Sequence, residues 1–311
     1  MSRHTLFAII PGLLLFLAAG HVPAQMYKYQ DENGVWHFSD SPPPSDQRRR
    51  HPSQEGPSSS NKKQVIIHQQ GKDDAPIFEA SNTLPMPIQL EFSATQMKNM
   101  RAVPPLPLRK VIPAGSREPL TRFEKIDPDA PWGYTYRTRF IPGDPAAEHL
   151  TGKPYLPPFS SHKEFSIAQA FNGETSHNAH ALTRYAIDIP MPADSTVHAA
   201  RSGTVVEMQT GKLSPKRRRK TFYVRILHRD GTFGLYAHLL PDSVKLFTGM
   251  TINRGQVIGR LGSGAEESSP HLHFAVQKNV GMQLESIPFE FTSLEGIPQT
   301  PKTGLLLRHP L

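Results

Sequence analysis

Hydrophobic and polar residues alternate with a period of two over several short stretches of the chain. Such alternation is typical of β-strands with one buried face. The first example lies near the N-terminus, where residues 26–30 and 35–39 alternate on either side of Asn33 and Gly34. An Asn-Gly pair between two alternating runs favours a tight turn. We therefore predict a small β-hairpin domain at residues 25–43.

Residues 77–140 contain further alternating runs, among them residues 88–92 and 134–140, and proline- or glycine-rich breakers separate them. Short alternating strands with frequent turns predict a small antiparallel β-sandwich. No cluster of catalytic side chains accompanies these runs. We interpret this stretch as a packing or recognition module, which a connector at residues 154–159 joins to the rest of the chain.

The remainder of the chain, from about Phe165, predicts a larger sheet. Its candidate strands are residues 203–209, 222–228, 232–239, 256–261 and 272–277. Glycines punctuate these strands as turn residues. No helical periodicity is long enough to provide the crossover helices of a parallel sheet. The sequence therefore predicts a mainly β protein whose largest domain is an antiparallel β-sheet.

The composition indicates that not all of the chain is packed. A length of 311 residues is enough for about two domains, and 31 prolines against 37% hydrophobic residues indicate extended linkers. Residues 44–75 are rich in Arg, Ser, Pro, Gln and Lys, which predicts a disordered basic linker. The net charge of +8 favours an anionic partner: a cell-wall polymer, a membrane surface or a nucleic acid. A basic run at residues 216–220 is either a solvated loop tip or a contact for such a polymer.

The N-terminus indicates export. Arg3 precedes an apolar run at residues 6–19 that is too short and too interrupted for a comfortable membrane span. Small residues up to Ala24 complete the pattern of a cleaved signal peptide, which we place at residues 1–24. We expect a periplasmic or secreted protein with no stable membrane span after cleavage. The chain has no cysteine and hence no disulfide, and export argues against nucleic acid as the partner.

The segment Pro-His-Leu-His-Phe-Ala-Val at residues 270–276 carries side chains capable of chemistry. On a β-strand, His271 and His273 share one face, while Leu272 and Phe274 occupy the other. Imidazole is a common metal ligand and also a general base near neutral pH. The pair can therefore divide these two tasks, although many such pairs on strands are only exposed or hydrogen-bonded.

Four other residues are candidates for the same site. Asp188 lies in a short strand with apolar neighbours, where it either meets a cation or accepts turn hydrogen bonds before Pro190. His238 ends a strand and is either a site residue or a partly buried histidine bonded to the backbone. His177 and His180 lie in a polar loop before the Asp188 strand, where a histidine is otherwise simply solvated.

The order of these residues resembles that in the lysostaphin-type, or LytM-like, zinc metallopeptidases, which cut peptide bonds in bacterial peptidoglycan. The resemblance covers about residues 173–278. Its segments are Tyr-Ala-Ile-Asp at 185–188, Val-His-Ala-Ala-Arg-Ser-Gly at 197–203, Tyr-Ala-His-Leu at 236–239, Gly-Gln-Val-Ile-Gly at 255–259 and Pro-His-Leu-His-Phe at 270–274. We place a LytM-like metallopeptidase domain at residues 161–290, after an accessory β-sandwich at residues 76–160 and before a C-terminal tail at residues 291–311.

The resemblance also implies the roles of the site residues. Zinc would be held by a loop histidine, Asp188 and His273, and the catalytic imidazoles would be His238 and His271. Which of these two imidazoles acts as the general base stays open at this point.

The sequence departs from the family pattern at the first ligand. Family members commonly place this histidine four residues before the aspartate, but Arg184 stands there, four residues before Asp188. The nearest candidates are His177 and His180. We favour His177, because Ser-His-Asn before a Tyr-Ala-Ile-Asp strand looks like a subgroup with a longer loop.

The N-terminal hairpin has a resemblance of its own. It is similar to a small domain of unknown function that begins many exported bacterial proteins, with Asp-Glu-Asn-Gly at residues 31–34 and Ser-Asp-Ser-Pro-Pro at residues 39–43. This resemblance implies no chemistry.

The implied function is that of an exported zinc endopeptidase that hydrolyses peptidoglycan cross-links by means of a zinc-activated water. Peptidoglycan is then the main partner, divisome or wall-synthesis proteins are further candidates, and we expect a monomer. The alternative is an inactive LytM-like domain that binds and regulates another wall hydrolase, and a third reading is a purely wall-binding β-protein. Inactive domains typically lack several site residues, so the presence of Asp188, His238, His271 and His273 favours the enzyme.

Overall fold

The computed structural model describes residues 27–30, 36–39, 64–174, 176–209, 222–240, 243–263 and 269–310. The expected signal peptide, the basic run at residues 216–220 and most of the expected linker lie outside these ranges. Strands β1 (Tyr27–Gln30) and β2 (Trp36–Ser39) pair antiparallel, with Tyr29 opposite His37. The two strands that the alternation predicts near the N-terminus are thus present.

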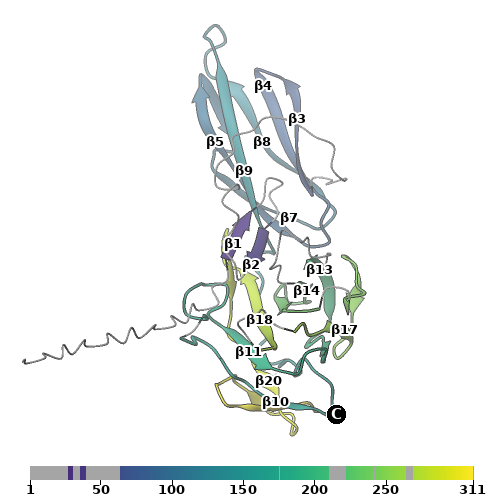
Figure 1. Cartoon of the computed structure of the whole chain (residues 1–311). Helices are drawn as coiled ribbons and strands as arrows, with labels where there is room; N and C mark the ends of the chain where they lie inside the picture. The colour runs from purple at the N-terminus through teal and green to yellow at the C-terminus, as the bar shows by residue number, and fades with distance from the viewer. Residues whose placement is uncertain are drawn as a thin grey trace, which may run out of the picture.

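Two antiparallel sheets face each other above the rest of the chain (Figure 1). One has the strand order β3-β4-β8-β6 and the other the order β7-β5-β9. The strands are β3 (Val65–Lys72), β4 (Ala75–Asn82), β5 (Ile88–Lys98), β6 (Met100–Val103), β7 (Leu108–Ile112), β8 (Arg117–Lys125) and β9 (Gly133–Pro142). Between the sheets, the ring centroid of Phe78 lies 5.0 Å from that of Phe92. The predicted small β-sandwich is therefore confirmed.

The sandwich begins earlier in the chain than its composition suggests. The expected disordered linker at residues 44–75 is wrong over β3, which pairs with β4 from Val65 opposite Asn82 to Lys72 opposite Ala75. Val65, Ile66 and Ile67 are half-buried there. Backbone hydrogen bonds to a neighbouring strand and three consecutive β-branched residues stabilise an edge strand. The composition of residues 44–75 as a whole is polar, so it does not reveal a run as short as Val65–Ile67.

The main sheet has the strand order β11-β18-β15-β14-β13-β16, with β19 beside β18, and its pairs are antiparallel. The strands are β11 (Ala186–Pro190), β13 (Gly203–Gln209), β14 (Tyr223–Leu227), β15 (Phe233–Ala237), β16 (Thr251–Ile252), β18 (His271–Asn279) and β19 (Leu284–Ser286). The described residues contain no α-helix. The prediction of a mainly β, antiparallel fold is confirmed.

Three two-stranded sheets complete the main domain. They pair β12 (Thr196–His198) with β17 (Val257–Arg260), β10 (Glu164–Ser166) with β22 (Leu306–Arg308), and β20 (Phe291–Thr292) with β21 (Pro298–Gln299). The structure therefore differs from the expected tail at residues 291–311, because Phe291 and Leu307 are buried in the main core. Tyr155 and Phe159 belong to the same core, so the main domain also begins before residue 161.

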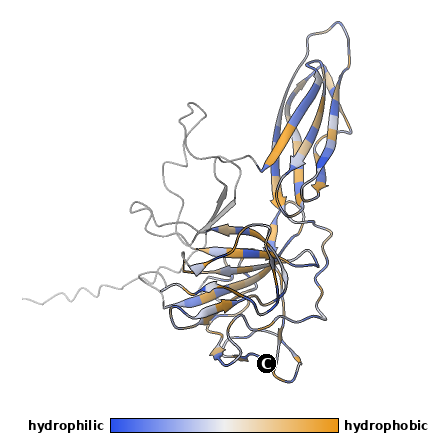
Figure 2. Cartoon of the chain, turned by 90° about the vertical axis from the view of Figure 1, so that its right-hand side faces the viewer, coloured by the Kyte–Doolittle hydropathy of each residue, from blue (hydrophilic) through white to orange (hydrophobic). Residues whose placement is uncertain are grey.

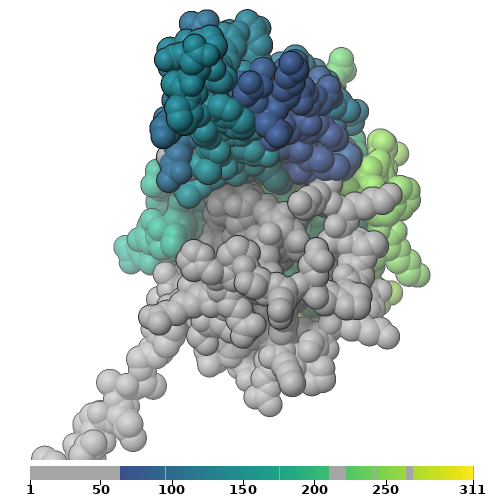
Figure 3. All heavy atoms as spheres, turned by 90° about the horizontal axis from the view of Figure 1, so that it is seen from above, coloured from purple at the N-terminus to yellow at the C-terminus, as the bar shows by residue number. Residues whose placement is uncertain are grey.

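The two faces of the main sheet bury different side chains. One face packs Leu272, Phe274 and Val276 of β18 into the core of the main domain. On the opposite face, Phe233 and Leu235 of β15 belong to the same apolar cluster as the core of the sandwich. Apolar positions recur along the strands of both the sandwich and the main sheet (Figure 2). In the view from above, atoms of the main domain are visible beside the sandwich (Figure 3). The sandwich and the main sheet therefore share one core.

Buried hydrogen bonds also join the two modules. The backbone N–H of Met282 donates to Gln89 Oε1 at 2.6 Å, and Asn279 Nδ2 donates to the carbonyl oxygen of Gly143 at 3.0 Å. Asn279 Oδ1 also accepts from the N–H of Gly281 at 2.9 Å. Buried polar groups that are paired in this way are costly to separate. We infer that the sandwich is held rigidly on the main sheet.

The substitution Asn279→Ala tests this junction. It leaves the buried carbonyl of Gly143 and the N–H of Gly281 without their partner, so we expect a loss of about 1–3 kcal/mol in the free energy of unfolding. Urea denaturation of the purified protein measures it. Asn253→Ala, the same change at an exposed position, should shift the free energy by less than about 0.5 kcal/mol. Equal unfolding midpoints for the two variants would contradict the inference.

Candidate metal centre

The period-two geometry of β18 brings His271 and His273 to the sheet face that also carries Asp188. Asp188 on β11 lies directly opposite His273, and its Oδ1 is 2.8 Å from His273 Nδ1. The Nε2 atom of His271 lies 4.0 Å from the same carboxylate oxygen. The predicted shared face is therefore present, and a carboxylate from a second strand completes it.

His177 reaches this group from the loop before β11. Its Nδ1 lies 2.9 Å from the carbonyl oxygen of Ala170 and its backbone N–H donates to Gly173, so the fully buried ring is fixed in place. A ring whose Nδ1–H donates to a carbonyl carries its lone pair on Nε2. That Nε2 lies 3.2 Å from Asp188 Oδ2. The structure thus brings His177 to the carboxylate.

His180, the other loop candidate, lies outside the group. Its carbonyl oxygen accepts from the N–H groups of Thr183 and Arg184, so residue 180 opens the turn that leads into β11. The loop itself is attached to β11 by the backbone hydrogen bond from the N–H of Asp188 to the carbonyl of Gln169 at 2.8 Å. These bonds place the first histidine of the loop, and not the second, against the carboxylate.

The donor atoms fit a metal ion. One nitrogen from each of His177 and His273 and one oxygen of Asp188 lie within 4.8 Å of one another. The Nε2 atom of His177 is buried and, among the residues that the structure describes, has no hydrogen-bond partner, although it lies beside the carboxylate. Two imidazoles and a carboxylate form a donor set typical of catalytic zinc sites, which use three protein ligands. These residues can therefore hold zinc.

Burial and charge act against each other on these groups. Burial favours the neutral form of Asp188, but His177 and His273 outweigh it and hold its pKa well below the usual range. Burial also lowers the pKa of His273, against the opposing effect of Asp188. For His177, burial would lower the pKa, but the adjacent carboxylate raises it. Asp188 is thus an anion at neutral pH, as a metal ligand must be.

Two more imidazoles flank the group. The ring centroid of His238, which follows β15, lies 4.6 Å from that of His271 and 6.1 Å from that of His273. Burial, together with smaller effects of the neighbouring His271 and His273, lowers the pKa of His238 to about 3. The Nδ1 atom of His271 lies 2.9 Å from the carbonyl oxygen of Ser269. All five residues that the family resemblance implies are therefore gathered at one place.

Some supporting groups have no signature in the sequence. The acceptor for His177 is a backbone carbonyl, and any residue type at position 170 could provide it. Gln169 donates through Nε2 to Ser176 Oγ at 2.8 Å and so braces the loop. The backbone of His238 is in the left-handed region, with φ of 67°, which residue type alone does not predict. Contacts of this kind depend on the fold.

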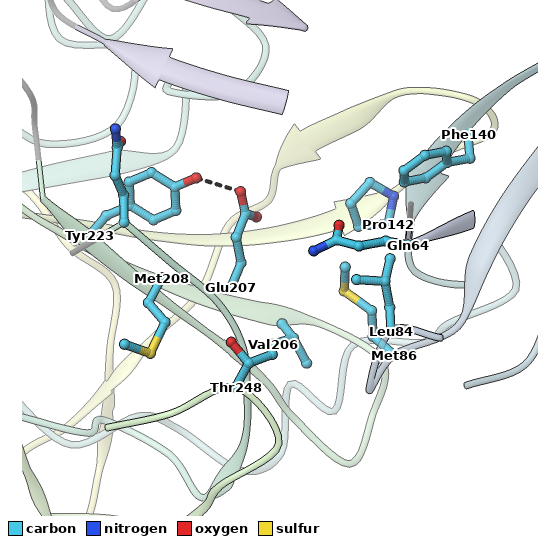
Figure 4. A pocket seen from close by; sticks show the side chains of 11 residues that line it. Gln64, Leu84, Met86, Phe140, Pro142, Val206, Glu207, Met208, Tyr223 and Thr248 are labelled. Carbon is cyan, nitrogen blue, oxygen red and sulfur yellow. Dashed lines mark hydrogen bonds between the residues drawn. The ribbon is translucent and has the colours of Figure 1, made fainter. Parts of the chain in front are cut away.

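A cavity of about 180 Å³ lies farther along the same sheet face, between β13, β14 and the sandwich (Figure 4). Tyr223 lies opposite Ala237, which lies opposite His273, so the cavity begins two strands away from the candidate metal centre. The Tyr223 hydroxyl donates to Glu207, and burial raises its pKa. The sandwich supplies the facing wall with Leu84 among other residues.

Among the residues that the structure describes, no helix has the length and apolar character needed to cross a bilayer.

Two family models match the chain. Residues 183–284 match the model described as peptidase family M23, and residues 13–65 match a domain of unknown function (DUF4124). The first match contains Asp188, His238, His271 and His273, and His177 lies just before it. Both predicted resemblances are confirmed.

Several solved structures are similar to this chain. The catalytic domain of the prophage-encoded M23 protein EnpA from Enterococcus faecalis is 20% identical, with 43% of this chain and 93% of that chain covered and a TM-score of 0.32. The catalytic domain of lysostaphin from Staphylococcus simulans is 22% identical, with 46% and 95% covered and a TM-score of 0.27. A peptidase M23 protein from Pseudomonas aeruginosa is 13% identical, with 68% and 87% covered and a TM-score of 0.30.

Proposed function

We propose that this protein, whose residues 183–284 match peptidase family M23, is an exported zinc metalloendopeptidase. Its proposed reaction is the hydrolysis of the peptide cross-links of bacterial peptidoglycan. The observation that carries the proposal is the convergence of His177, Asp188 and His273 on one point of the sheet. We assign these three residues as the metal ligands. With three protein ligands, a zinc ion held here would keep a fourth position for water, as hydrolytic zinc sites require.

The ligand residues prepare this site before any substrate arrives. When bound there, zinc supplies a positive charge that lowers the pKa of a water molecule towards about 7 and polarises a substrate carbonyl. The Ala170 carbonyl fixes the tautomer of His177, and Asp188 contributes the negative charge. Because the His177 ring is buried and held by a backbone carbonyl, it needs little reorganisation during the reaction.

We assign different tasks to the two remaining imidazoles. The Nδ1–H of His271 donates to Ser269, so its lone pair is on Nε2, on the side of the Asp188 carboxylate. This nitrogen is placed to take a proton from the attacking water. His238, whose pKa is lowered to about 3 by burial, is a poor base at neutral pH. As a neutral imidazole, it can donate a hydrogen bond to the oxygen on which negative charge develops.

The cellular setting follows from the same proposal. Cleavage of a signal peptide at residues 1–24 would deliver the protein to the periplasm or the exterior, where peptidoglycan is accessible. Peptidoglycan is anionic, and the net charge of +8 favours contact with it. The presence of all five site residues supports an enzyme more than an inactive regulator of another hydrolase.

Digestion of purified peptidoglycan sacculi tests the proposed activity. We expect the zinc-loaded protein to convert cross-linked muropeptides into monomers, and we expect chelator-treated protein and His271→Ala to leave the cross-links intact. Chromatography of the muropeptides measures the outcome. If the zinc-loaded protein binds sacculi but leaves every cross-link in place, the regulatory alternative is the better account.

A further inference from the structure

His238 has a backbone conformation that is uncommon for residues other than glycine. Its φ is 67°, in the left-handed region that residues with a Cβ rarely adopt. The residue directly follows β15, whose last residue, Ala237, lies opposite His273. Because the side-chain direction depends on φ, a relaxed backbone at residue 238 would turn the ring away from His271. Strained conformations of this kind persist only where the surroundings hold them.

The surroundings of His238 do hold it, on both sides. Its carbonyl oxygen accepts from the N–H of Gly262 at 2.8 Å. The next residue, Leu239, donates its N–H to Phe222 at 3.1 Å and forms an isolated bridge with Leu261. The segment that follows β17 therefore lies against the segment that follows β15, and residues 261 and 262 fix the backbone next to the imidazole.

Gly262 has a role that only glycine fills without displacement. A Cβ at this position would lie 3.0 Å from the carbonyl oxygen of His238 and 3.7 Å from the carbonyl carbon of Leu239. Contacts near 3.0 Å are closer than an ordinary carbon–oxygen approach, so the neighbouring backbone would have to move by a few tenths of an ångström. The atoms that would move belong to His238 itself.

We propose that Gly262 is a positioning residue, which acts through the backbone of His238 and keeps the imidazole of His238 beside His271. The proposal rests on the proposed function, because it assigns Gly262 a part in that reaction. The nearest neighbours of a Cβ at Gly262 are backbone atoms of His238 and Leu239. Because Gly262 has no side chain, its backbone approaches that of His238 closely, and this contact determines the position of the His238 ring.

The first test is kinetic. A displacement of about 1 Å in a catalytic group costs about 100-fold in rate. Because a Cβ at Gly262 would move the backbone of His238 by only a few tenths of an ångström, we expect Gly262→Ala to lower kcat about tenfold. KM and zinc content should remain unchanged, since His177, Asp188 and His273 lie on other segments. Gly133→Ala is the matched control, because a Cβ at Gly133 meets nothing within 4 Å.

A double-mutant cycle separates positioning from general destabilisation. If Gly262 acts through His238, adding Gly262→Ala to His238→Ala lowers kcat no further. If the two losses multiply, or if Gly262→Ala loses zinc or raises only KM, the proposal is overturned.

A second readout does not depend on peptidase activity. In ¹⁵N-labelled, zinc-loaded protein, Gly262→Ala should shift the imidazole signals of His238 and leave those of His177 unchanged, and Gly133→Ala should shift neither. Unchanged His238 signals would overturn the proposal even if the enzyme is active. Shifted signals in a protein that cleaves no peptidoglycan would retain the structural role of Gly262 and reject only the proposed function.

Discussion

Asp188→Asn is expected to abolish zinc retention and, with it, peptidoglycan hydrolysis. The amide has nearly the shape of the carboxylate but lacks its charge, and the carboxylate is the only anion among the three proposed ligands. Changing a residue that merely supports a metal ligand already costs about 10- to 100-fold in affinity, so loss of a ligand's charge should cost at least about 100-fold. Metal analysis after dialysis and a competition titration with a chromogenic chelator measure the change.

Two controls make this result specific. Asp194→Asn removes an equally charged carboxylate that is exposed and paired with Arg260, and it should leave the zinc content at one ion per chain. Within the loop, His177→Ala should lose zinc, whereas His180→Ala should keep it, because only His177 faces the carboxylate. Full zinc retention by Asp188→Asn, or loss of zinc from His180→Ala but not from His177→Ala, would refute the ligand assignment.

His271→Ala is expected to lower kcat by about 100- to 10,000-fold while zinc stays bound, which is the usual contribution of a positioned general base. The ring stands beside the ligand group, and its Nε2 lies 4.0 Å from Asp188 Oδ1, but His271 is not one of the proposed ligands. Steady-state cleavage of a cross-linked muropeptide measures kcat, and metal analysis of the same sample measures zinc.

The matched control for this change is His68→Ala. His68 lies on β3 of the sandwich, where its Nε2 contacts Ser81 Oγ at 2.9 Å, so its removal should leave kcat within about twofold, as is usual for a surface change away from the site. A zinc-free His271→Ala protein would make His271 a ligand and contradict its assignment as the base. Full activity of the zinc-loaded variant would also contradict it.

Much of the fold could be predicted because it depends on local alternation. The run at residues 203–209 coincides with β13, and the His-x-His run lies on β18, where period two places His271 and His273 on one face. The strand neighbours of Asp188 could not be predicted in this way. Its pairing with His273 joins residues 85 positions apart, and only the topology of the sheet decides such a contact.

The parts that sequence reasoning missed share a physical cause. β3 is stabilised by pairing with β4, and residues 291–308 are ordered because Phe291 and Leu307 fill a core made by distant segments. In both cases another part of the chain decides the outcome, by backbone pairing for β3 and by side-chain packing for Phe291 and Leu307. The preference for His177 over His180 came from the family resemblance, and the contacts that distinguish the two, from His177 Nδ1 to the Ala170 carbonyl and from the Thr183 N–H to the His180 carbonyl, depend on the fold.

The apolar cluster that runs from the sandwich into β15 has a practical consequence for work with this protein. If residues 64–150 were removed, the apolar side chains of Phe233, Leu235 and Met282 would be exposed to solvent. An exposed apolar surface of this kind promotes aggregation. The boundaries of the family match are therefore poor guides for cloning. A recombinant fragment intended to keep the five site residues folded should begin no later than β3, so that it contains both the sandwich and the main domain.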